Sequence, residues 1–346
     1  MKIKKTLAFD DVLLSPRFSA IESRSSIDVS TSLRDLPFGL PMVSSPMDTV
    51  TESAMLKAMS ESRGLGIVHR YNTIQAQSSI VHRAHAEGAK NIGAAIGVSG
   101  DYIDRAKSLV MAGANVLCID IAHGHHSLMK NALKCVRSMF DDSVYIIAGN
   151  VATLEGFNDL SDWGADGVRV GIGGGSICST RIQTGHGVPT FQSILDCASS
   201  DRDAALISDG GIRNSGDVCK ALAAGADFVM LGSALAGTDE SPGEVLHAPE
   251  VASGKLTYSK QKVYRGMASI EAQVDWRGHA ASEEGVSSTV PYRGSVEKVL
   301  SSLEKGLRSG MSYSGSSSLS EFRSKAVFIA QTQSGQIESS THVNMM

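Results

Sequence analysis

Eight short apolar segments recur along the chain, and each runs directly into small or polar residues. The segments are LPMVSSPM (40–47), GLGIVHR (64–70), NIGAAIGV (91–98), NVLCIDIAHG (115–124), VYIIAGNV (144–151), GVRVGIGGG (167–175), AALISDGGI (204–212) and FVMLGSALAG (228–237). Their apolar residues are continuous rather than alternating, which is typical of strands buried on both faces of a parallel sheet. Between them, stretches such as 101–114 and 215–227 carry apolar residues at i, i+3 and i+4, which predicts helices.

Eight strands alternating with helices in one domain-sized length favour an α/β fold of the closed (β/α)₈ type, a TIM barrel. We expect residues 1–346 to form this single barrel domain, with a mobile flap at about 268–290 and a C-terminal tail at about 310–346. The serine- and glycine-rich tail is expected to contact the barrel mouth or another subunit. A doubly wound open sheet is the alternative that periodicity alone leaves open.

Composition and charge exclude several classes of partner. The chain has 346 residues, of which 42% are hydrophobic and 20% charged, so it can bury a large core. Basic and acidic residues are scattered and give a net charge of −4, without a basic face for nucleic acid or a polybasic run for a membrane surface. No segment reaches the roughly 18 to 20 apolar residues that a membrane-spanning helix needs. We therefore predict a cytoplasmic protein that acts on small molecules.

The five cysteines are widely spaced and include no C-x-x-C pair, which argues against disulfides and zinc clusters. Cys178 differs from the others because it lies in GIGGGSICSTRIQTGHG (171–187), among glycines and hydroxyls and near Arg181. An exposed, electropositive loop favours a reactive thiolate, so Cys178 is a candidate nucleophile; an inert core thiol is the alternative. The remaining cysteines lie within strand or helix patterns and are predicted to be structural: Cys118, Cys135, Cys197 and Cys219.

Polar residues follow the predicted strands at their C-terminal ends, which form the active-site face of a (β/α)₈ barrel. The segments SDGG (208–211) and LGS (231–233) end the seventh and eighth strands, where glycine N–H groups often bind phosphate. Tight turns are the alternative explanation for these glycines. Asp120 and His123 follow the fourth strand and suggest a polar rim for a cofactor rather than a metal site. Asn150 after the fifth strand also fits a simple turn cap.

Eight motifs occur in an order that resembles the IMP dehydrogenase and GMP reductase family over almost the whole chain. They are FDDVLLSP (9–16), VSSPMDTVTES (43–53), IDIAHGH (119–125), AGNVAT (148–153), VGIGGGSICSTR (170–181), SDGGIRNSGD (208–217), GSALAGTDESPGE (232–244) and YRGMAS (264–269). The resemblance implies a (β/α)₈ barrel, usually a homotetramer. It also implies binding of a purine nucleoside monophosphate and a nicotinamide cofactor, with a covalent bond between a cysteine and purine C2.

The same resemblance assigns roles to individual residues, with Cys178 as the nucleophile. Residues matching nucleotide-binding positions are Ser45, Met47, Ser176, Asp209, Gly210, Gly211, Gly232, Ser233, Tyr264, Gly266 and Met267. Among these, Asp209 matches the carboxylate that binds the ribose hydroxyls. Residues expected at the nicotinamide cofactor are Asp120, Ala122, His123, Asn150 and Gly171. The carbonyls of Gly173, Gly175 and Cys178 resemble a site for a monovalent cation, potassium in expectation, to which a neighbouring subunit supplies a residue resembling Glu338.

Within the family, the sequence favours a GMP reductase that uses NADPH. The stretch 267–284 is shorter than the dehydrogenase flap and lacks its Arg-Tyr pair, which activates the hydrolytic water. Paired CBS modules, which dehydrogenases usually carry, are also missing near 82–93. Thr180 and Glu284 resemble the pair that reductases use for deamination, with Glu283 as the alternative to Glu284.

Two other functions remain open at this point. A compact IMP dehydrogenase that uses NAD⁺ would share every residue named above, and Arg277 is then the candidate substitute for the missing flap arginine. Dehydrogenase-like features support it, including SSPMDTVTE (44–52) and DGGIRNSGD (209–217), and Gly174 departs from the proline usual in the family. A catalytically silent nucleotide-binding protein is the third hypothesis.

Overall fold

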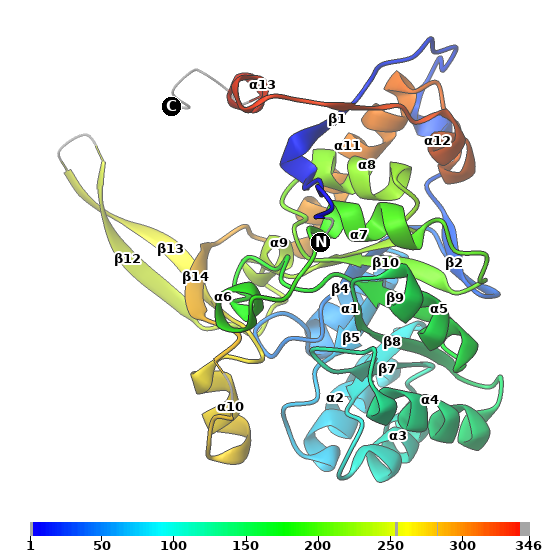
Figure 1. Cartoon of the computed structure of the whole chain (residues 1–346). Coiled ribbons are helices and arrows are strands. Elements are labelled where there is room, and N and C mark those ends of the chain that lie inside the picture. Colours follow the sequence, from blue (N-terminus) through cyan, green and yellow to red (C-terminus); the bar gives the residue numbers. More distant parts are fainter. Residues whose placement is uncertain (1–2, 253–254, 282, 340–346) are drawn as a thin grey trace.

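Eight parallel strands close into a barrel in which each strand pairs with its neighbours in chain order (Figure 1). The structure is a computed structural model that describes residues 3–252, 255–281 and 283–339. The barrel strands are β4 (Met42–Ser44), β5 (Leu65–Val68), β6 (Ile92–Ile96), β7 (Val116–Asp120), β8 (Tyr145–Val151), β9 (Gly167–Val170), β10 (Ala205–Asp209) and β11 (Phe228–Leu231). Pairing of β11 with β4 closes the ring, so the TIM barrel prediction is confirmed and the open sheet is excluded.

Helices connect the strands and cover the outside of the barrel, as the periodicity predicted (Figure 1). Those that pack on it are α1 (Ser53–Glu61), α2 (Ile74–Ala86), α3 (Tyr102–Met111), α4 (Ser127–Phe140), α5 (Leu154–Asp162), α7 (Thr190–Cys197), α8 (Ser215–Ala223) and α11 (Val296–Tyr313). Several begin at side-chain caps that satisfy free backbone N–H groups: Thr73, Thr153 and Asn214 each accept from a residue of the first turn. Two short helices, α6 (Thr180–Thr184) and α9 (Ser233–Ala236), follow β9 and β11.

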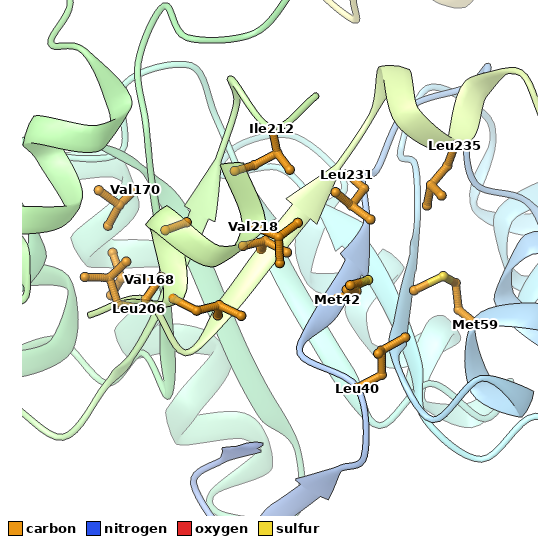
Figure 2. Close-up of a cluster of buried hydrophobic side chains, with 14 of the residues drawn as sticks. Leu40, Met42, Met59, Val168, Val170, Leu206, Ile212, Val218, Leu231 and Leu235 are labelled. Carbon is orange, nitrogen blue, oxygen red and sulfur yellow. The ribbon is translucent and has the colours of Figure 1, made fainter. Parts of the chain in front are cut away.

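Side chains alternate along each strand between the barrel interior and the helices outside. The outward residues form the larger core, in which Val168, Leu206 and Leu231 of the strands lie near Val218 and Leu235 of the helices (Figure 2). The inward residues form a second core that fills the barrel: Val43, Leu65, Ile67, Ala95, Val116, Cys118, Ile147, Ala205, Ile207, Phe228 and Met230. The continuous apolar runs of the sequence reflect burial on both faces.

An N-terminal hairpin, which the sequence analysis did not predict, closes the bottom of the barrel. It consists of β2 (Thr31–Leu33) and β3 (Leu36–Phe38). Leu33 and Phe38 join the inner core beside residues at the beginnings of the barrel strands. The Phe38 ring packs edge-on against Phe228, with 5.3 Å between the ring centroids. The open end of the barrel is therefore the end at which the strands finish.

A three-stranded antiparallel sheet projects beside the barrel on the side of α6 (Figure 1). Its strands are β12 (Val245–Ala252), β13 (Lys255–Arg265) and β14 (Ser287–Pro291), and helix α10 (Ile270–Arg277) lies between the last two in sequence. The predicted flap at 268–290 thus contains a helix and part of a strand, apart from residue 282, which lies outside the described residues. This sheet was not predicted from the sequence, because its strands lie outside the alternating strand–helix repeat of the barrel.

The C-terminal tail runs back along the N-terminal segment. After α11 come α12 (Leu319–Lys325), β15 (Phe328–Ala330) and α13 (Gln333–Glu338). Strand β15 pairs antiparallel with β1 (Val12–Leu14), and Phe328 packs against Phe191 of α7. The short 3₁₀ helices η1 (Phe9–Asp11) and η2 (Arg24–Ser26) complete the N-terminal segment. Residues 340–346 of the predicted tail lie outside the described residues. Across the ranges described, no helix is both long and apolar enough to span a membrane.

We predict that Phe38→Ala lowers the free energy of unfolding by about 3–5 kcal/mol, because it opens a cavity at the bottom of the inner core. Urea unfolding followed by circular dichroism measures the change. Phe18→Ala is the matched control, since Phe18 is 92% exposed whereas Phe38 is 2% exposed. Equal destabilisation by the two variants would contradict the assignment of the hairpin as a structural plug.

Candidate active site

A cavity of about 410 Å³ opens at the C-terminal ends of the barrel strands. It brings together nearly all the residues that the sequence predicted at the site. Those that line it are Ser45, Met47, Asp120, Ala122, Asn150, Gly171, Gly173, Gly175, Ser176, Cys178, Thr180, Asp209, Gly210, Gly211, Gly232, Ser233, Tyr264, Gly266, Met267 and Glu284. This volume lies within the roughly 300–1,000 Å³ typical of small-molecule sites.

Cys178 lies in the loop between β9 and α6, beside the segment that follows α10. Its Sγ is 3.2 Å from the hydroxyl oxygen of Thr180. The backbone of Cys178 forms an antiparallel bridge with Gly285, and the N–H of Ser179 donates to the carbonyl of Glu284 at 3.1 Å. These bonds fix the acidic segment against the cysteine loop.

The two candidate glutamates occupy different positions. Glu284 lines the cavity together with Cys178 and Thr180, whereas Glu283 is exposed and is not among the lining residues. The backbone carbonyl of Glu283 instead accepts from the hydroxyl of Ser179 at 2.7 Å. Of the two glutamates, Glu284 is therefore the one that borders the same cavity as Cys178.

Close backbone approaches shape the end of the cavity at β10 and β11. A Cβ atom at Gly232 would lie 2.8 Å from the hydroxyl oxygen of Tyr264, and Gly210 has a φ of +96°, which favours glycine. Burial raises the pKa of Tyr264 to about 12, so its hydroxyl stays protonated near neutral pH; the pKa is lowered slightly by a hydrogen bond with Ser176. This end of the cavity thus offers hydroxyl groups and accessible backbone N–H groups to an anion.

A buried arginine that the sequence reasoning missed lines the cavity from the barrel strand β9. Arg169 of β9 donates to Asp120 Oδ1 at 2.5 Å and to Asp209 Oδ2 at 2.8 Å. Burial disfavours the charged guanidinium, but the two carboxylates outweigh this and raise the pKa of Arg169 above its usual range. A lone charge in the buried segment GVRV was the available signal, because a charge inside a barrel strand needs partners.

Asp209 is further held by Asn150, whose Nδ2 donates to Oδ2 at 2.7 Å and to the carbonyl of Gly171 at 2.9 Å. Both Arg169 and Asn150 thus donate to the same oxygen of Asp209. Oδ1 has no hydrogen-bond donor among the described residues and remains available to a ligand hydroxyl. One network therefore links the residues predicted at the ribose with those predicted at the nicotinamide.

Three further side chains that had no role assigned from the sequence line the cavity, and one of them lies near Asp120. They are Arg70, Tyr71 and Gln273, and the Nε of Arg70 is 3.9 Å from Asp120 Oδ2. His123 is exposed and does not line the cavity, although its neighbour Ala122 does. Partial desolvation and then the nearby histidines lower the pKa of His123. The assignment of His123 to the cofactor site therefore lacks support from the geometry of this chain.

The three residues predicted to bind a cation through their carbonyls all lie in the cysteine loop. Gly173, Gly175 and Cys178 line the cavity, and the carbonyl of Gly175 also accepts from the N–H of Cys178 at 3.2 Å. Glu338 is exposed on α13, which lies away from α6 in this chain (Figure 1). Among the described residues, no cluster of three or more histidine, cysteine, aspartate or glutamate side chains is arranged to hold a metal.

Comparison with known proteins identifies one family. The family model described as the IMP dehydrogenase / GMP reductase domain matches residues 6–342. The chain is 34% identical to an inosine-5'-monophosphate dehydrogenase of Nitrosopumilus maritimus over 480 aligned positions, covering 99% of both proteins. It is 42% identical over 291 positions to a GMP reductase of Leishmania major, covering 80% of this chain and 58% of the relative.

A solved structure agrees with these matches. A crystal structure of a cysteine-to-alanine variant of GMP reductase from Trypanosoma brucei, in complex with guanosine 5'-monophosphate, has a TM-score of 0.90 to this chain. The two sequences are 31% identical, and the match covers 99% of each chain. Relatives of both activities are thus similar to this chain along most of its length.

We predict that iodoacetamide modifies Cys178 and the half-buried Cys135 in the folded protein and spares the other three cysteines. Burial raises the pKa of each of those three thiols to about 12, so few thiolates form at neutral pH: Cys118, Cys197 and Cys219. Peptide mass spectrometry measures the modification of each cysteine. Modification of Cys118 as fast as that of Cys178 would show that the barrel interior is open to reagent.

We also expect Arg169→Met to lower the free energy of unfolding by about 3–5 kcal/mol, because it leaves two carboxylates without their buried cation. Urea unfolding provides the measurement. Arg202→Met removes an arginine whose ion pairs with Asp162 and Asp201 lie at the surface, and this control should unfold close to the parent protein. Unchanged unfolding of Arg169→Met would argue against a structural role for the ion pairs.

Proposed function

The chain belongs to the IMP dehydrogenase / GMP reductase family, and on this basis we propose that it is a GMP reductase. The proposed reaction converts GMP, NADPH and a proton into IMP, ammonia and NADP⁺. The observation that supports it best is the short connection at 267–284, which lacks an Arg-Tyr pair and is tied to the cysteine loop beside the cavity that Cys178, Thr180 and Glu284 line. The guanosine monophosphate held by the Trypanosoma brucei GMP reductase is consistent with this substrate.

The nucleotide would lie between the β10–β11 end of the cavity and Cys178. Ser176, Ser233 and Tyr264 offer hydroxyl groups to the phosphate, and Gly211 and Gly232 offer backbone N–H groups. Oδ1 of Asp209 would accept from a ribose hydroxyl. Ser45, Met47, Gly266 and Met267 would then border the base and ribose.

The chemistry at purine C2 would proceed in two steps. The Cys178 thiol loses its proton and its sulfur adds to C2, while the exocyclic amine accepts a proton and leaves as ammonia. Glu284, together with Thr180, would move the proton to the amine. In the second step C2 accepts a hydride and the carbon–sulfur bond breaks, which releases IMP and regenerates the thiolate. In total, the amino group leaves C2 with one added proton as ammonia, and the hydride takes its place on C2.

The Asp120 side of the cavity suits a dinucleotide. The reduced nicotinamide supplies the hydride when it is bound. Asp120, Ala122, Asn150 and Gly171 provide polar groups and a close backbone approach there. Arg70 adds a positive charge at this side, although its Nε already faces Asp120 Oδ2 at 3.9 Å.

A compact IMP dehydrogenase is the second candidate, because relatives with that name match the chain at similar identity. It would convert IMP, NAD⁺ and water into XMP, NADH and a proton and would need a group that activates water. Arg277 lines the cavity and its guanidinium donates to the side chain of Gln273. This arginine is therefore the residue to test if the chain oxidises IMP.

The proposal includes a cytoplasmic homotetramer with a potassium site between subunits. The exposed position of Glu338 on α13 is consistent with contact to a neighbouring copy.

Absorbance of the reduced nicotinamide tests the proposed function in two mixtures, GMP with NADPH and IMP with NAD⁺, each with potassium. We expect absorbance to fall in the first mixture and stay constant in the second. A rise in the second mixture alone would establish the dehydrogenase. No change in either, with tight GMP binding, would indicate a silent nucleotide-binding protein.

We predict that Glu284→Gln lowers kcat for GMP reduction by roughly 100- to 10,000-fold, because the amide cannot deliver a proton. Glu283→Gln is the matched control and should retain most activity, since only its backbone carbonyl bonds to the cysteine loop. Steady-state assays with GMP and NADPH measure both variants. Loss of activity in Glu283→Gln alone would reassign the proton donor.

A further inference from the structure

An aromatic stack attaches helix α10 to the loop after β5 at one edge of the cavity. The rings of Tyr71 and Trp276 lie nearly parallel, with an interplanar angle of 15° and 4.2 Å between centroids. Tyr71 lines the cavity, and its burial raises the pKa of its phenol. The chemistry proposed above uses neither ring.

Helix α10 has few other apolar attachments. Its buried residues are Ala272 and Gln273, whereas Ile270 and Val274 are 44% and 43% exposed. Asp275 accepts from Arg265 at 2.6 Å, but that carboxylate is largely exposed, so this ion pair contributes little to docking. The stack of Trp276 on Tyr71 is therefore a main attachment of α10 to the barrel.

The stack also borders the cation that faces Asp120. The Cζ of Arg70 lies 5.4 Å from the centroid of Tyr71 and 5.5 Å from that of Trp276, within the range of cation–π attraction. Arg277 approaches the Trp276 ring at 5.5 Å. Docking of Trp276 thus restricts Arg70 to the Asp120 side of the cavity and brings Arg277 to its rim.

We propose that Trp276 is a positioning residue that couples docking of α10 to binding of the dinucleotide. By stacking on Tyr71 it completes the Asp120 side of the cavity and holds Arg70 where the dinucleotide is expected. The identity of this ligand rests on the proposed function. The residues expected at the phosphate, such as Ser176 and Ser233, lie on other loops, so GMP binding should depend little on the stack.

Equilibrium binding of NADP⁺, NAD⁺ and GMP tests this assignment in the full-length protein. Trp276→Ala is expected to weaken binding of the preferred dinucleotide by roughly three- to tenfold, the range for loss of one aromatic pair, and to change GMP binding by less than twofold. Trp276→Phe should restore most of the affinity, and Trp276→Leu should not, because leucine retains apolar volume without a ring. Equal weakening of GMP and dinucleotide binding, or full affinity in Trp276→Leu, would overturn the proposal.

Tryptophan fluorescence gives a second readout, because the chain contains only Trp163 and Trp276. Trp163 follows α5, near His125 and Lys130, so Trp163→Phe leaves Trp276 as the sole reporter. In this variant the oxidised dinucleotide should change the emission, whereas GMP alone should not. No response to a dinucleotide that binds would overturn the proposal.

These measurements separate the proposal from the proposed function. They score binding of oxidised dinucleotides and require no turnover, so a dehydrogenase would give the same split between dinucleotide and GMP. Failure of GMP reduction would instead appear in the absorbance assay, with the binding split preserved. Tyr71→Leu provides a second variant that removes the stack from the other side.

Discussion

The barrel mouth depends on one buried cation between two carboxylates from strands on either side of it. Arg169 on β9 pairs with Asp120 on β7 and Asp209 on β10, and Asn150 on the intervening strand completes the network. Taking these charges out of water costs several kcal/mol per ion, so the arrangement persists only because each ion finds its partner. An apolar interior lies directly below, where Cys118 and Ile207 point inward. This layer of charged and polar side chains therefore separates the apolar core of the barrel from the cavity above it.

Above this layer, backbone hydrogen bonds join two loop segments that are far apart in the sequence. The cysteine loop and the segment after α10 share the Cys178–Gly285 bridge and the bond from Ser179 to Glu284. Cys178 and Glu284, separated by about a hundred residues in sequence, thus border the same cavity. The opposite edge is closed by aromatic packing of α10. Backbone hydrogen bonds thus hold the side where the nucleotide is expected. The Tyr71–Trp276 stack holds the side where the dinucleotide is expected.

The fold was largely readable from the sequence because burial on both faces leaves continuous apolar runs, and all eight barrel strands fall within them. Almost all of the site residues that motif resemblance predicted line the cavity, but His123 is exposed and does not. Arg169 and the Tyr71–Trp276 stack were missed, since each depends on contacts between distant segments that local patterns do not encode. The β12–β14 sheet was missed for a similar reason: its strands are partly exposed and pair outside the barrel repeat.

The most direct test of the account is an attempt to trap the proposed covalent bond between Cys178 and the purine. Oxidised NADP⁺ cannot supply a hydride, so protein mixed with base-labelled GMP and NADP⁺ should stop after ammonia has left. Rapid acid quenching and precipitation would then recover label with the parent protein and none with Cys178→Ala. Label bound equally to both proteins, or absent from both while GMP is reduced at a normal rate with NADPH, would contradict covalent catalysis by Cys178.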